Sequence, residues 1–72
     1  MTAPTHQTLR ARRLELGMKQ AALTYLISRI LKRRIGVGVT QPTVSRWEAG
    51  LQQPGTPAHW RAWRAALGLK GD

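Results

Sequence analysis

The sequence has no cysteine and only three acidic residues, against 12 lysines and arginines. Without cysteine there can be neither a disulfide framework nor a thiolate metal site, and His6 and His59 are the only soft ligands that remain. We therefore expect no metal and no cofactor. The excess of cations gives a net charge of +9, and this charge favours an anionic partner.

Long apolar runs and a secretory signal are also missing, so we expect a cytoplasmic protein that does not enter a membrane. A chain of 72 residues buries only about 60% of the surface that it exposes when unfolded, which leaves little room for a catalytic cleft. The length therefore argues against an enzyme. We expect a single domain over residues 5–70, with flexible ends at 1–4 and 71–72.

Hydrophobic spacing and four glycines predict an all-α fold, a compact bundle of four or five short helices. The first helix is expected at 5–16 and the second from 19 or 20 to 35. A third begins after Thr40 and ends at Ala49, and a fourth begins at Thr56 and Pro57 and ends before Gly68. The expected core residues are Leu9, Leu16, Leu23, Val44, Trp47, Trp63 and Leu67.

Two stretches carry the most specific pattern, Arg13-Leu-Glu-Leu-Gly-Met-Lys-Gln20 and Val39-Thr-Gln-Pro-Thr-Val-Ser-Arg-Trp-Glu-Ala-Gly50. Their order and spacing over residues 9–69 resemble the Xre/Cro/cI-type helix-turn-helix family of bacterial and phage DNA-binding regulators. The resemblance implies a lambda-repressor-like fold, in which the short third helix enters the major groove of DNA. The connection between the second and third helices is longer here than the usual short turn, by about ten residues.

The polar residues of the third helix are the candidates for reading DNA bases. Arginine can bond guanine and glutamine can bond adenine with two hydrogen bonds each. The family commonly uses the first position of this helix and the position five later, which are Gln41 and Arg46. Thr43 and Ser45 lie between them and are expected to contact a base edge or a phosphate. Ordinary solvation is the alternative interpretation of all four residues.

Phosphate contacts are expected from the second helix. Gln20 matches the glutamine with which relatives clamp a phosphate, and Lys19 adds a charge where they often have a capping residue. Lys32, Arg33 and Arg34 form either a second phosphate patch or the solvated side of a long helix. The lengthened connection could also displace the second helix from DNA, which would remove the role of Gln20.

Arg13 lies on the apolar stripe of the first helix, and Glu48 is the only acidic residue of the third. Each would be costly to bury alone, so we expect a buried ion pair between them. Relatives in the family place an arginine and a glutamate at the matching positions. Trp60 and Trp63 are expected to be core residues, and a dimer interface is the alternative.

The sequence thus predicts sequence-specific binding of double-stranded DNA by a small Cro-like repressor of a bacterial cell or a phage-infected host. An inverted-repeat operator is expected if the chain forms a homodimer, for which the C-terminal helix is the candidate surface. An antitoxin-type autorepressor and a phage accessory DNA-binding factor fit the same pattern. A basic RNA-binding protein is a more distant alternative. A membrane-active cationic peptide fits the charge and the tryptophan content, but short helices that end in glycine and carry a polar recognition face fit a globular fold better.

Overall fold

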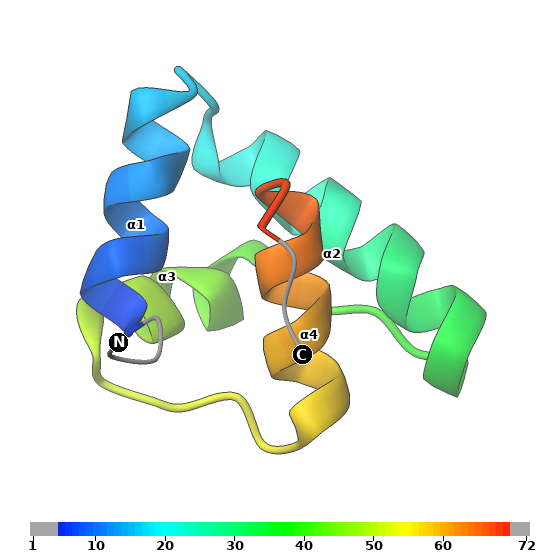
Figure 1. Ribbon diagram of the computed structural model, residues 1–72. Coiled ribbons are helices and arrows are strands. Elements are labelled where there is room, and N and C mark those ends of the chain that lie inside the picture. The colour runs from blue at the N-terminus through cyan, green and yellow to red at the C-terminus, as the bar shows by residue number, and fades with distance from the viewer. Residues whose placement is uncertain (1–4, 70–72) are drawn as a thin grey trace.

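Four helices form the fold in the computed structural model, which describes residues 5–69 (Figure 1). They are α1 (His6–Glu15), α2 (Gln20–Ile35), α3 (Gln41–Ala49) and α4 (Pro57–Ala66). The predicted all-α bundle is confirmed, and each helix begins and ends within two residues of its predicted bounds. The expected flexible ends, 1–4 and 71–72, lie outside the described residues, as does residue 70 of the predicted domain.

Helix α2 is the centre of the bundle, because it packs against both α3 and α4 while α1 packs against α3. Its inward side chains Leu23, Ile27 and Leu31 recur at helical spacing and are fully buried. With 16 residues it is the longest helix, and nowhere in residues 5–69 is a helix long and apolar enough to cross a membrane. The core cluster consists of Leu9, Leu23, Ile27, Leu31, Val44, Trp47, Ala62, Trp63 and Leu67.

Leu16 is not part of this core, although its spacing from Leu9 predicts that it is. Helix α1 ends at Glu15, and Leu16 is a C-cap residue whose side chain is 45% exposed. The chain turns at Gly17, and Met18 packs against the core instead. Met18, and not Leu16, therefore contributes to the core at this end of α1.

An aromatic cluster joins α3 to α4. The ring of Trp63 stacks on Trp60 with 5.4 Å between centroids and lies 5.5 Å from Trp47. His59 meets Trp47 edge-on at 5.9 Å. Trp63 is fully buried and Trp60 is half-buried against the core, as expected for core residues. Trp63 is therefore not available to a dimer partner.

The helix ends follow local chemistry, with one difference from expectation. The Thr56 hydroxyl accepts a hydrogen bond from the backbone N–H of His59 and caps α4. Thr40 occupies the N-cap position of α3 but makes no side-chain cap; its hydroxyl lies 3.0 Å from that of Thr43. Gly50 ends α3 with φ of 77°, a left-handed conformation that side chains disfavour, and a Cβ there would lie 2.7 Å from the His6 ring.

The exposed position of Leu16 outside the core can be tested with a matched pair of substitutions. Leu23→Ala empties a fully buried position, so the free energy of unfolding should fall by about 2–5 kcal/mol. Leu16→Ala removes the same atoms from an exposed position and should cost less than about 1 kcal/mol. Urea unfolding followed by circular dichroism measures both values, and equal losses would place Leu16 in the core after all.

Candidate nucleic-acid interface

Helix α3 presents a continuous exposed edge, because its buried residues gather on the opposite side. Val44, Trp47 and Glu48 face the bundle. Successive residues of a helix are about 100° apart, so the exposed positions of α3 fall on one arc of less than half a turn. The exposed residues of this arc, here called the α3 edge, are Gln41, Pro42, Ser45, Arg46 and Ala49.

Three of the four predicted base-reading residues, Gln41, Ser45 and Arg46, lie on the α3 edge, and Thr43 does not. Thr43 is half-buried, and its hydroxyl is hydrogen-bonded to that of Thr40. It is about 160° around the helix from Ser45. Thr43 therefore lies on another side of α3 from Ser45, at the margin of the buried side, and stands apart from the other three candidates.

A buried ion pair holds α3 against α1, and this prediction is confirmed. Arg13 donates from Nε to Oε2 of Glu48 at 2.6 Å and from Nη2 to Oε1 at 3.0 Å. Its Nη1 donates to the backbone carbonyl of Met18 at 2.8 Å. Arg13 is 9% exposed and Glu48 is 4% exposed. Two parallel hydrogen bonds of this kind fix distance and orientation together, so the pair sets the angle at which α3 lies.

Gln20 extends this ion pair to the start of α3. Its Nε2 donates to Oε1 of Glu48 at 3.0 Å, and its Oε1 accepts a long hydrogen bond of 3.4 Å from Nε2 of Gln41. The carboxylate can only accept, so it determines which end of the Gln20 amide faces it. Gln20 therefore has a positioning role within the protein that the sequence does not reveal. One hydrogen of its Nε2 remains for the predicted phosphate contact.

Ser28 fixes the connection between α2 and α3 from the other side. Its hydroxyl donates to the carbonyl oxygen of Val39 at 2.9 Å and accepts from the Val39 backbone N–H at 3.0 Å. The chain approaches so closely that a Cβ at Gly38 would lie 3.1 Å from Oγ of Ser28. Three separate contacts thus set the start of α3 and its tilt: Ser28 with Val39, Gln20 with Gln41, and Arg13 with Glu48.

The three predicted cationic residues at the end of α2 are all exposed and begin from different sides of the helix. The aliphatic end of Lys32 lies beside Gly38, on the side of the connection to α3. Arg33 is about 100° farther round the helix and lines a groove between α2 and α4. Arg34 is exposed at the last turn. Lys32 therefore lies beside the chain that leads into α3. Lys19 is exposed at the other end of α2, next to Gln20.

Two residues of this region were not anticipated from sequence. Ser28 has no local signal except that it is a small polar residue opposite a Gly-Val-Gly stretch. The sequence predicts Ala49 as the last residue of α3, and the structure shows that it also lies on the exposed edge. Helical spacing of four residues from Ser45 could have identified it.

The region contains no arrangement suited to a bound metal. Within the described range, no group of three histidine and carboxylate side chains could hold a metal ion. His59 packs on Trp47 and hydrogen-bonds to Thr56, and His6 packs on Gly50. Comparison of the chain with protein-family models, curated proteins and solved structures finds no match.

The importance of the buried pair can be measured against an exposed pair on α1. Glu48→Ala leaves the Arg13 guanidinium buried without a counter-ion and should lower the free energy of unfolding by about 3–5 kcal/mol. Glu15→Ala breaks the Arg12–Glu15 pair, in which the glutamate side chain is 70% exposed, and should cost less than about 1 kcal/mol. Chemical denaturation of both variants gives the comparison. A Glu48→Ala variant as stable as Glu15→Ala would contradict the structural role of the pair.

Proposed function

We propose that the chain binds double-stranded DNA in a sequence-specific manner, with α3 as the recognition helix of a helix-turn-helix, and acts as a small transcriptional regulator. The observation that carries the proposal is the α3 edge itself, a polar and basic surface held in place by the buried pair of Arg13 and Glu48. A helix with its side chains is about 10–12 Å wide, which matches the width of the major groove of B-form DNA.

The chemistry of the α3 edge suits base edges. Arg46 can donate two hydrogen bonds to guanine, and Gln41 can pair with adenine through its amide. Pro42 and Ala49 add small apolar groups of the kind that contact the methyl group of thymine. Gln20 limits the orientations of Gln41 before DNA arrives, which reduces the entropy lost on binding.

The surroundings of the α3 edge favour a polyanion. Lys19 and Lys32 supply charge at the two ends of α2 for phosphate contacts, and the N-terminal end of α2 has no side-chain cap. Among residues 5–69 the acidic side chains are Glu15, which is paired with Arg12, and Glu48, which is buried with Arg13. No carboxylate of the described chain therefore repels DNA from this surface.

A Cro-like repressor is the role that we propose for this binding, and a homodimer on an inverted-repeat operator is the arrangement that we propose with it. An antitoxin-type autorepressor and a phage accessory DNA-binding factor would use the same surface in the same way.

Selection from a pool of random duplexes by the purified chain tests the proposal. We expect one preferred sequence, whose binding survives an excess of random duplex and of RNA. If the chain forms a dimer, half-sites should be about 10 base pairs apart, or a multiple of one DNA turn. Equal binding of random duplex and RNA would favour the RNA-binding alternative and reject sequence-specific recognition.

Two substitutions separate base reading from phosphate binding. Arg46→Ala should relax the preference at one base position, at a cost of about 1–3 kcal/mol for the preferred duplex. Lys19→Ala should weaken all duplexes alike and reduce the slope of log K against log salt by about one unit. Binding isotherms over a series of salt concentrations measure both effects. An unchanged preferred sequence after Arg46→Ala would reject α3 as the recognition helix.

A further inference from the structure

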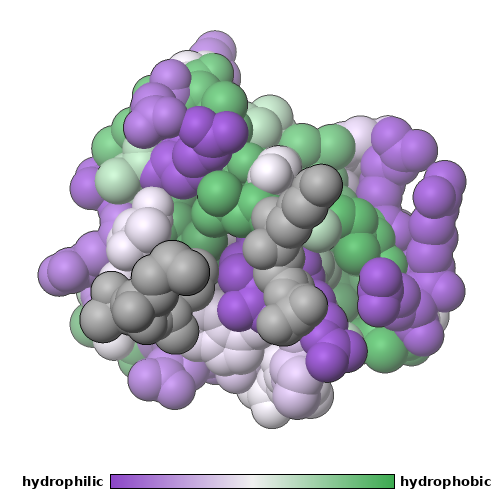
Figure 2. Space-filling model, in the orientation of Figure 1, coloured by the Kyte–Doolittle hydropathy of each residue, from purple (hydrophilic) through white to green (hydrophobic). Residues whose placement is uncertain are grey.

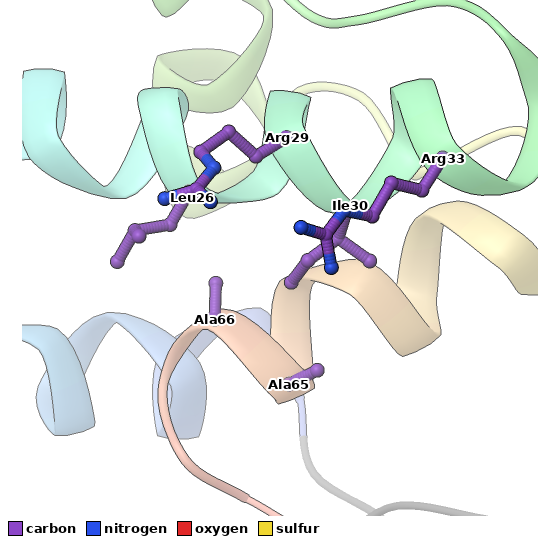
Figure 3. Close-up of a pocket in the computed structure, with 6 residues that line it drawn as sticks. All are labelled: Leu26, Arg29, Ile30, Arg33, Ala65 and Ala66. Carbon is purple, nitrogen blue, oxygen red and sulfur yellow. The ribbon is translucent and has the colours of Figure 1, made fainter.

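A groove with an apolar floor and two cations separates α2 from α4 (Figure 3). The groove has a volume of about 260 Å³ and is open to solvent. Its lining residues are Leu26, Arg29, Ile30, Arg33, Ala65 and Ala66. Figure 2 shows apolar surface beside strongly hydrophilic surface where α4 borders α2. This groove, here called the α2–α4 groove, has no part in the proposed DNA interface.

The two arginines are arranged along one side of the α2–α4 groove. In Figure 3 both side chains run back toward the N-terminal half of α2, and they line the groove together with Leu26 and Ile30. Arg29 also lies over the ring of Tyr25, with 5.8 Å from its guanidinium carbon to the ring centroid. Tyr25 is 62% exposed, so this aromatic ring extends the surface beside the groove.

No acidic side chain of residues 5–69 neutralises these arginines. The ion pairs there are Arg12–Glu15 and Arg13–Glu48, and neither involves the α2–α4 groove. The same scarcity of acids makes a second copy of this chain a poor occupant, because both described glutamates are already paired. The complementary ligand must bring carboxylates of its own.

Duplex DNA also fits the α2–α4 groove poorly. Arg29 and Arg33 are about 100° and 140° around α2 from Ser28, which bonds the connection to α3, so they lie on a different side of α2 from that connection. The floor formed by Leu26, Ile30 and the two alanines needs an apolar group to cover it, and a phosphate backbone offers none. Arginine and tyrosine around an apolar centre are instead typical of protein–protein interfaces.

We propose that the α2–α4 groove binds a short acidic segment of another protein. An apolar side chain of the segment sits on Leu26, Ile30, Ala65 and Ala66, and flanking carboxylates pair with Arg29 and Arg33. The pairing of an apolar anchor with charged neighbours distinguishes such a segment from a simple polyanion. Because this surface lies on a different side of α2 from the connection to α3, a partner protein could be bound while DNA is held.

The test begins with a yeast-displayed library of random linear peptides, selected against the full chain at physiological ionic strength. Enriched peptides are then synthesised with a fluorophore and titrated by fluorescence anisotropy against the chain and three variants. Arg29→Glu and Arg33→Glu reverse charges at the groove, and Arg10→Glu reverses an exposed charge on α1 as the matched control. Circular dichroism verifies that all three variants keep the helical fold.

We expect the enriched peptides to combine glutamate or aspartate with a large apolar residue. Their affinity should fall about tenfold or more with Arg29→Glu or Arg33→Glu and should be little changed with Arg10→Glu. Replacing the apolar residue of the peptide by serine should weaken binding to a similar degree. The peptide measurement needs no DNA, so it stands or falls separately from the proposed function.

Four results would overturn the proposal. The first is a selection that enriches no acidic peptides with an apolar residue. Arg10→Glu could weaken binding as much as the groove variants, or the serine peptide could bind as tightly as its parent, and either result would show attraction to charge alone. In a parallel duplex titration, a larger loss from the groove variants than from Arg10→Glu would assign the arginines to phosphates.

Discussion

The buried pair of Arg13 and Glu48 is the constraint on which the arrangement of this molecule depends. A domain of this size has a small core, and an ion buried without its partner would cost a large part of its stability. An arrangement that separates α1 from α3 is therefore unfavourable, because it loses the ion pair as well as apolar contacts. The pair also anchors Gln20 and, through it, Gln41. The interaction that stabilises the fold is thus the same one that orients the start of α3.

The distribution of the cations gives the charge of +9 a more specific meaning than attraction to any anion. Arg13 is used inside the protein, where it neutralises Glu48. Arg46 lies on α3, Lys32 lies beside the chain that leads into it, and Lys19 lies at the N-terminal end of α2 next to Gln20. Arg29 and Arg33 lie on a different side of α2, beside an apolar floor. Two cationic surfaces of different chemistry therefore share one small domain, one suited to phosphates and bases and the other to carboxylates beside an apolar group.

Most of the fold could be predicted from local signals in the sequence, whereas features that depend on packing could not be predicted. Glycine, threonine and proline at helix ends act within a few residues, so the helix bounds follow from sequence. The pair of Arg13 and Glu48 was predictable because each residue lies on an inward stripe where a lone charge is unfavourable. Other features depend on where the neighbouring helices end and which side they cover. These are the exposure of Leu16, the partial burial of Thr43 and the different surroundings of Lys32 and Arg33. The contact of Ser28 with Val39 depends on the path of a glycine-containing connection, which helical periodicity does not describe.

We propose that the buried pair holds α3 so that its exposed edge meets DNA. The most direct measurement is the change in backbone amide chemical shifts when isotopically labelled protein is titrated with its selected duplex. We expect the largest changes on the α3 edge and on the first turn of α2, with Arg29, Arg33 and Ala65 little affected. Changes concentrated on the α2–α4 groove, or spread evenly over all the cationic residues, would contradict it.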